Sequence, residues 1–84
     1  MKIAWTESAW NDYLYWQSLD KKTLKRINKL IKDTQRSPLE GLGNPEMLKH
    51  DLQGFYSRRI DGQNRFVYSL KDDTIIIIAC RYNY

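Results

Sequence analysis

The spacing of apolar and polar positions predicts a short strand that leads directly into a helix. Residues 2–5, KIAW, form a short apolar run, and Thr6 followed by Glu7 is typical of a helix N-cap with an acid in the first turn. The next residues, 7–18, repeat with helical periodicity. We expect Trp16 to flank a helical face formed by Trp10, Tyr13, Leu14 and Gln17.

A second helix is predicted over residues 21–36, KKTLKRINKLIKDTQR, with Asp20 as its N-cap. The Ser37-Pro38 pair should end it, because the residue before a proline avoids the helical region. One side of the helix is apolar at Leu24, Ile27, Leu30 and Ile31. The other side carries basic residues spaced alternately three and four apart, namely Lys22, Lys25, Lys29, Lys32 and Arg36. We therefore expect a core face opposite a continuous basic stripe.

The segment 37–54 holds both prolines and three glycines, which predicts a long loop with a short ordered middle. Loops of this length in a compact domain are usually functional or disordered, and its glutamate and lysine favour function. After it, FYSRRID and RFVYSL separated by GQN predict one hairpin, and TIIIIACRY after KDD predicts another. The element order predicts an α+β fold, an antiparallel sheet of order β-α-α-β-β-β with two helices on one face.

The first hairpin also has a predicted register. If Asp61 faces Arg65 across a three-residue turn, Arg58 pairs with Tyr68. We prefer this register because a shift by one residue would mix arginines into the core face. It gives an apolar face with Ile60, Phe66, Tyr68 and Leu70. It also gives a polar face with Ser57, Arg59, Asp61 and Arg65, on which the two arginines lie side by side.

The composition is that of one small intracellular domain. With 84 residues, of which 42% are hydrophobic, the chain can build one sheet under one helical layer, so we expect a single domain over residues 1–84. The lone cysteine, Cys80, excludes an internal disulfide and suits a buried thiol in a reducing cytoplasm. No segment resembles a signal peptide or a membrane span, so we expect a soluble, cytoplasmic protein without a membrane partner.

The net charge of +4 is concentrated in the second helix. Residues 21–36 hold seven Lys or Arg and one acid, Asp33. A solvated helix face is the usual explanation for such a stripe, but aligned cations repel one another. A polyanionic partner, either a nucleic acid or an acidic protein segment, is the better interpretation.

Four motifs resemble a known family. NPEMLKH, SRRI, NRFVY and the terminal CRYNY have the order and spacing of the YoeB toxin family, within the RelE/ParE superfamily of toxin-antitoxin systems. DYLYWQ and KRINKLIKD extend the resemblance over the whole chain. It implies a bacterial, ribosome-dependent endoribonuclease that cleaves mRNA in the A site and is neutralised by a YefM-type antitoxin. The basic stripe is then a candidate contact to ribosomal RNA, and the Trp and Tyr residues of the first helix make a homodimer reasonable.

The resemblance also implies a reaction without a metal or cofactor. In it, the 2′-hydroxyl of RNA attacks the adjacent phosphorus, which requires a base, cations around the phosphorane and an acid for the leaving oxygen. Glu46 matches the family's general base, and Arg65 matches the residue that stabilises charge on the phosphate. Lys49 and Arg59 are the supporting, substrate-binding cations. Tyr84 matches the final tyrosine that helps to hold the substrate.

The penultimate residue departs from the family pattern. The family has a histidine there that protonates the leaving 5′-oxygen, whereas this chain has Asn83. An amide can hydrogen-bond to a phosphate oxygen but is no acid at physiological pH. Losing a general acid typically costs about 10² to 10⁴ in rate, so we expect weakened cleavage. His50, Lys49 and Tyr84 remain alternative donors.

Plainer interpretations stand beside these. Glu46 would be an ordinary loop carboxylate or a cap, and the arginines would pair with Asp61 across the strands. The alternative function is a protein of the same fold that binds the ribosome or an antitoxin without cleaving, which Asn83 favours. A third is a gyrase-type poison of the wider superfamily, against which Glu46, Arg65 and Tyr84 argue together.

Overall fold

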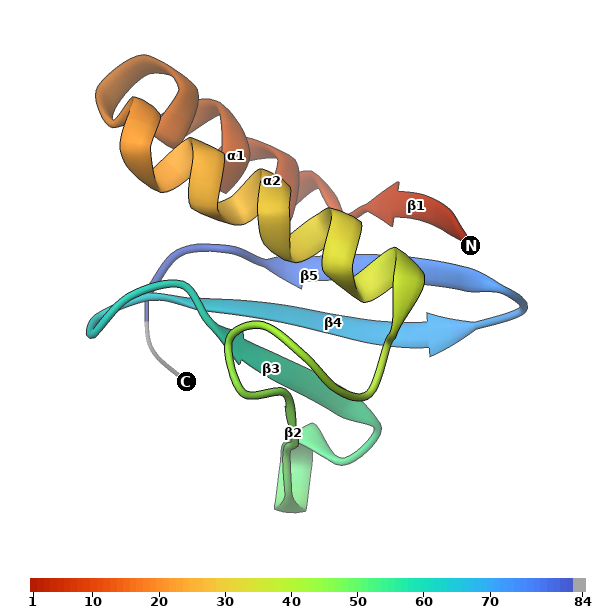
Figure 1. The fold of residues 1–84 in the computed structure, drawn as a ribbon. Helices are drawn as coiled ribbons and strands as arrows, with labels where there is room; N and C mark the ends of the chain where they lie inside the picture. Colours follow the sequence, from red (N-terminus) through yellow and green to blue (C-terminus); the bar gives the residue numbers. More distant parts are fainter. Residues whose placement is uncertain (83–84) are drawn as a thin grey trace.

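A five-stranded sheet with both helices on one face organises the chain (Figure 1). The structure is a computed structural model that describes residues 1–82, so the predictions for Asn83 and Tyr84 lie outside the described residues. The elements are β1 (Lys2–Trp5), α1 (Glu7–Leu19), α2 (Lys21–Arg36), β2 (Glu46–Met47), the 3-10 turn η1 (His50–Leu52), β3 (Phe55–Arg59), β4 (Arg65–Lys71) and β5 (Thr74–Ala79). The predicted α+β fold and its element order are confirmed.

The sheet is mixed, with the strand order β1-β5-β4-β3-β2. The β3–β4 and β4–β5 pairs are antiparallel as predicted. The antiparallel β2–β3 pair was not predicted, and β1 departs from the predicted antiparallel sheet because it pairs in parallel with β5. The two-residue β2 is the ordered middle of the long loop, and it extends the sheet at the edge that carries Glu46. No helix among residues 1–82 is both long and apolar enough to cross a membrane.

Side chains set the helix ends where the sequence predicted them. Thr6 is the N-cap of α1, where its hydroxyl accepts a hydrogen bond from the Ala9 amide at 3.1 Å. Asp20 caps α2 by accepting from the amides of Lys22 and Thr23. The Thr23 hydroxyl also donates to this carboxylate, at 2.8 Å. All of these bonds lower the pKa of the Asp20 carboxyl, and the bond from the Thr23 hydroxyl has the largest effect. Ser37 ends α2 before the proline.

Of the helical face predicted for α1, only Tyr13 packs against the core. Trp16 is buried and its indole N–H donates to the Cys80 carbonyl at 2.8 Å, whereas Trp10 and Leu14 are 44% and 40% exposed. Aromatic residues occur on both sides of this helix, so periodicity alone did not distinguish them. Trp10 instead stacks on Tyr13 at the flank, with ring centroids 5.6 Å apart.

The register of the first hairpin differs from the prediction by two residues. Arg59 pairs with Arg65 and Arg58 pairs with Phe66, which leaves residues 60–64 as the turn. The turn is longer because the Asp61 carboxylate accepts from the amides of Gln63 and Asn64, both at 2.8 Å. A shift of two preserves the two faces, so the polar face with adjacent arginines is present.

The core lies between the helices and the sheet. The predicted apolar side of α2 is confirmed, since Ile27 and Leu30 are fully buried and Leu24 and Ile31 pack against them. Cys80 belongs to the same cluster, and burial raises the pKa of its thiol to about 12. The burial of the thiol was expected from the sequence, and at that pKa it is an unsuitable nucleophile.

Candidate active site

Three strands bring a carboxylate and two guanidinium groups together on the sheet face opposite the helices. Glu46 on β2 pairs with Ser57 on β3, and Arg59 on β3 pairs with Arg65 on β4. Side chains alternate between the faces of a strand, so these residues point away from the helices. They surround a small polar hollow, lined by Gly43, Asn44, Glu46, Ser57, Arg59 and Arg65. Three of the predicted site residues therefore share one surface.

The turn of the hairpin anchors Arg65. Its guanidinium Nη1 donates to the carbonyl oxygens of Asp61 and Asn64, at 2.9 and 3.2 Å. Within residues 1–82 its guanidinium forms no ion pair with a carboxylate, so the proposed cross-strand pair with Asp61 is absent. The positive charge of Arg65 is held in place by neutral carbonyl groups. The guanidinium is therefore available to form a charge-assisted hydrogen bond to an anion in the hollow.

The last described residues are fixed beside Arg65. The Tyr82 carbonyl accepts from the Arg65 amide at 2.8 Å, and the Tyr82 amide donates to Asn64 Oδ1 at 2.7 Å. Asn64 is 9% exposed and also donates to the Asp61 carboxylate. The guanidinium of Arg81 lies 3.5 Å from the ring centroid of Tyr15. Sequence reasoning missed Asn64, whose place in a turn gave no sign that it would hold the carboxy-terminal segment.

Lys49 and His50 are not brought into the hollow. Both are exposed, Lys49 just before η1 and His50 within it, and neither lines the polar hollow. A backbone φ of 59° at His50 turns the chain there. Their assignment as a supporting cation and an alternative acid stays a prediction. Among residues 1–82, no three His, Cys, Asp or Glu side chains are grouped as metal ligands.

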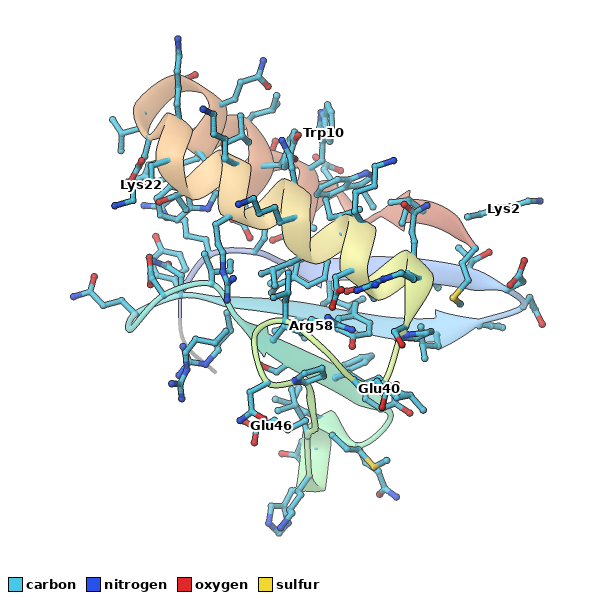
Figure 2. All side chains as sticks on the ribbon, viewed as in Figure 1. Lys2, Trp10, Lys22, Glu40, Glu46 and Arg58 are labelled. Carbon is cyan, nitrogen blue, oxygen red and sulfur yellow. The ribbon has the colours of Figure 1, made fainter. Side chains whose placement is uncertain are left out.

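The basic stripe is a continuous exposed surface of α2. All five predicted cations are exposed: Lys22, Lys25, Lys29, Lys32 and Arg36. Three of them, Lys29, Lys32 and Arg36, rim an open hollow of about 450 Å³ over Leu42. Figure 2 shows Lys22 and Glu46 at separate ends of the molecule, on α2 and β2. The stripe and the polar hollow are thus two different surfaces.

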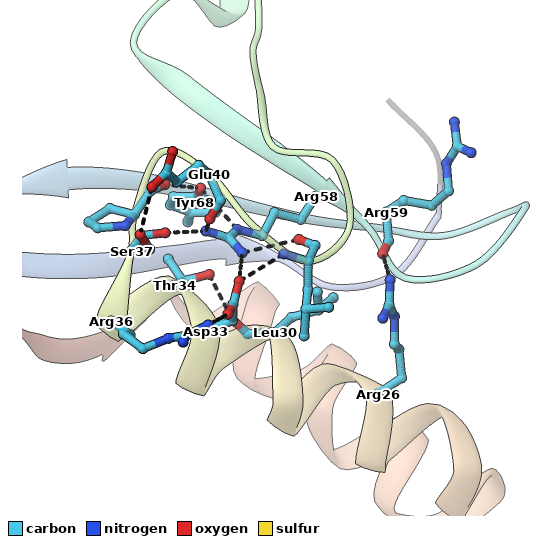
Figure 3. A network of polar contacts seen from close by, with 12 residues as sticks. Arg26, Leu30, Asp33, Thr34, Arg36, Ser37, Glu40, Arg58, Arg59 and Tyr68 are labelled. Atoms are coloured by element: carbon cyan, nitrogen blue, oxygen red, sulfur yellow. Dashed lines mark hydrogen bonds and ion pairs between the residues drawn. The ribbon is translucent and has the colours of Figure 1, made fainter.

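A buried ion pair joins α2 to β3, and sequence reasoning did not foresee it. Arg58 has no exposed surface and donates from Nη1 to Asp33 Oδ2 at 2.7 Å (Figure 3). The Arg36 side chain, the Leu42 amide and Arg58 all donate to this carboxylate, and they lower its pKa from about 3.8 to about 2. In the predicted hairpin, Arg58 already lay on the apolar sheet face with Tyr68. That position was a sequence signal from which a buried arginine could have been inferred.

Comparisons with known proteins agree with this architecture. A family model described as the YoeB-like toxin of bacterial type II toxin-antitoxin systems matches residues 5–84. Toxin YoeB of Escherichia coli strain K12 is 58% identical over 84 residues, which is the full length of both chains. The structure of the YoeB dimer from Staphylococcus aureus superposes with a TM-score of 0.92 at 46% identity. The comparison covers 100% of this chain and 98% of that one.

A second structure from Staphylococcus aureus, a YoeB-YefM complex, superposes equally well. Its TM-score is 0.92 at 45% identity, again with 100% and 98% coverage. The match to the family model spans nearly the whole chain, and the identity to the relatives extends over its full length. The chain therefore belongs to the YoeB-like toxins of bacterial type II toxin-antitoxin systems.

Proposed function

We propose that this toxin is a ribosome-dependent endoribonuclease that cleaves mRNA in the A site, with a rate reduced by Asn83. The observation that carries the proposal is the polar hollow, where Glu46 lies with Arg59 and Arg65 on one sheet face. A carboxylate beside two guanidinium groups suits a reaction that removes a proton from a hydroxyl and builds negative charge on a phosphate.

The chemistry follows from these groups. Glu46 takes the proton of the 2′-hydroxyl, whose oxygen attacks the adjacent phosphorus. The bond between phosphorus and the 5′-oxygen breaks, and that oxygen takes its proton from solvent water. The products are a 2′,3′-cyclic phosphate and a free 5′-hydroxyl. Arg65 and Arg59 stabilise the phosphorane, with Lys49 as a further cation. Asn83 can hold a phosphate oxygen but supplies no proton, and Tyr84 helps to hold the substrate.

The proposed partners follow from the family and the surfaces. We propose mRNA and ribosomal RNA as nucleic-acid partners, the latter contacting the basic stripe, in the cytoplasm. The YoeB structures from Staphylococcus aureus are a dimer and a complex with YefM. By analogy, we propose that this chain forms a homodimer and binds a YefM-type antitoxin.

A second candidate is a non-cleaving protein of the same fold that occupies the ribosome or an antitoxin. Asn83 is the specific observation in its favour, because the family's proton donor is missing from this position. This protein would block translation without producing RNA ends.

Primer extension on mRNA-programmed bacterial ribosomes separates the two candidates. The chain is compared with Glu46→Gln, Arg65→Gln and Asn83→His at equal ribosome occupancy. Glu7→Gln is the matched control, since Glu7 is an exposed glutamate of α1 that lies outside the polar hollow.

We expect Asn83→His to raise the cleavage rate by about 10² to 10⁴, as restoring a general acid should. Glu46→Gln and Arg65→Gln should abolish cutting, and Glu7→Gln should leave it unchanged. Cutting by Glu46→Gln at the parental rate would refute the site assignment. If every variant bound but none cut, the non-cleaving candidate would replace this proposal.

A further inference from the structure

The buried arginine binds the loop that follows α2. Arg58 donates from Nη2 to the carbonyl oxygens of Ser37 and Glu40, at 2.6 and 3.1 Å, and from Nη1 to that of Leu42 at 3.1 Å. Its Nε donates to the Tyr68 hydroxyl at 3.3 Å. One side chain of β3 thus fixes three backbone carbonyl groups of one loop (Figure 3).

The two partners of Arg58 bind the same loop. Asp33 Oδ2 accepts from the Leu42 amide at 2.8 Å, and the Tyr68 hydroxyl donates to the Pro38 carbonyl at 2.5 Å. Both partners are themselves buried. A buried ion pair is often no more stabilising than apolar side chains of similar volume. Stability alone therefore does not explain a charged core whose hydrogen bonds converge on one loop.

The fixed loop continues directly into the polar hollow. The Gly43 carbonyl accepts from the Arg59 amide at 2.6 Å. A Cβ on Gly43 would lie 2.9 Å from the Arg59 carbonyl oxygen, so the loop lies tightly against β3. Asn44, with φ of 51°, and Pro45 then restrict the backbone up to Glu46. Only three residues separate the last network contact from Glu46.

The helix holds the arginine side of the hollow as well. Arg26 of α2 donates from Nη2 to the Arg59 carbonyl at 2.9 Å and from Nε to the Ile60 carbonyl at 3.3 Å. Successive residues of β3 point to opposite faces, so Arg58 enters the network while Arg59 enters the hollow. A displacement of the network would therefore shift Glu46 relative to Arg59.

We propose that Arg58 is a positioning residue which, with Asp33 and Tyr68, sets the position of Glu46 against Arg59 and Arg65. Its catalytic consequence rests on the proposed nuclease function. Its structural consequence, a loop held at residues 37–43, does not. Misplacement of a catalytic group by about 1 Å can reduce a rate by about 10²-fold, so a loosened loop should impair cleavage in a protein that is still folded.

Amide hydrogen exchange tests the structural consequence. Tyr68→Phe removes the hydroxyl that contacts Pro38 and Arg58 but keeps the ring, and Arg58→Lys keeps the charge but loses the planar fork. Ile77→Val is the matched control, because it truncates a fully buried side chain that is not part of the network. We expect about 10-fold faster exchange of the Leu42 and Arg59 amides in Tyr68→Phe, with β5 unaffected. Exchange at parental rates, or equal acceleration in Ile77→Val, would overturn the proposal.

Cleavage on programmed ribosomes tests the catalytic consequence, in the chain itself and in the Asn83→His background. At temperatures where all variants are folded, Tyr68→Phe should reduce the maximal cleavage rate about 10-fold or more with unchanged ribosome affinity, and Ile77→Val should not. Parental rates in Tyr68→Phe would refute the positioning role. If no variant cut in either background, the nuclease proposal would fail, while the exchange result would still decide whether the network holds the loop.

Discussion

At the scale of single residues, Asp33 is the acid on which α2, β3 and the loop converge. The residue is 5% exposed, and its carboxylate accepts from Arg36, the Leu42 amide and Arg58. All three donors favour the ionised form, and together they outweigh the opposing effect of burial on the pKa. The ionised carboxylate thus binds both Arg58 and the loop residue Leu42.

Because the pKa of Asp33 is lowered in the folded chain, the stability of the fold depends on pH. The pKa of Asp33 is about 2 in the folded chain and near 3.8 when unperturbed, so the unfolded chain binds the proton first as the pH falls. The contribution of Asp33 is complete above about pH 3.8 and is lost as the pH falls through about 2. Asp33→Asn should therefore have a lower thermal midpoint at pH 7. Its midpoint should also fall less between pH 5 and pH 2.

Thermal unfolding monitored by circular dichroism at a series of pH values measures this. Asp51→Asn is the control, since Asp51 is exposed on η1 and forms no ion pair among residues 1–82. It should keep the parental pH dependence. Parallel curves for Asp33→Asn and the parent would show that the ionised carboxylate is not what stabilises the loop.

Gly41 is required by the same network. A Cβ there would clash with Asp33 Oδ2, and the φ of 111° already disfavours any other residue. Gly54 has a comparable φ of 96° but open space around it, so Gly54→Ala carries only the backbone strain, of order 1–3 kcal/mol. Gly41→Ala should be more destabilising than Gly54→Ala in urea unfolding. Equal free energies of unfolding for the two variants would mean that Asp33 moves aside freely.

Single residues also show where sequence reasoning reached its limit. The adjacency of Arg59 and Arg65 was predictable, because alternation along a strand fixes the face even when the register is off by two. The same alternation placed Arg58 among apolar residues, but its burial depends on Asp33, 25 positions earlier. Partners at that separation leave no local pattern in one sequence.

At the scale of elements, the sequence predicted the capping residues and the apolar side of α2, but it did not predict the buried face of α1. Thr6 and Asp20 form bonds to amides two or three residues away, which sequence spacing shows directly. The buried face of α1 depends instead on where β5 ends, since Trp16 donates to the carbonyl of Cys80. That contact joins residues 64 positions apart, and an aromatic-rich helix offered two plausible faces.

The start of α1 gives a test at this scale. The Thr6 hydroxyl accepts from the Ala9 amide and donates to the Ile78 carbonyl at 3.2 Å, so it caps α1 and ties it to the end of β5. Thr6→Ala should lower stability by about 1 kcal/mol, or the thermal midpoint by roughly 4–8 °C. Thr6→Ser keeps the hydroxyl and should remain within about 0.5 kcal/mol of the parent. A Thr6→Ser variant as unstable as Thr6→Ala would point to the lost methyl group instead of the cap.

At the scale of the whole molecule, different sides of α2 have three different roles. Ile27 and Leu30 face the core, Asp33 and Arg26 hold the segments that border the polar hollow, and the exposed cations form the basic stripe. Among the hydrogen bonds of residues 1–82 that hold the hollow, the stripe contributes only the bond that Arg36 gives to Asp33. Its lysines can therefore be changed without disturbing the candidate site.

This independence allows ribosome binding to be tested apart from cleavage. If Lys25 and Lys29 contact phosphates of ribosomal RNA, Lys25→Gln/Lys29→Gln should weaken binding and reduce the slope of log affinity against log salt by about 1 to 2. Lys2→Gln/Lys71→Gln removes the same amount of charge from two exposed positions outside α2. Lys2 is the first residue of β1, and Lys71 is the last residue of β4. Filter binding to 70S ribosomes between about 50 and 200 mM salt compares the two pairs. Because net charge is equal in both, a similar loss of slope would assign the effect to overall charge, whereas a loss confined to the α2 pair would identify the stripe as the ribosome-binding surface.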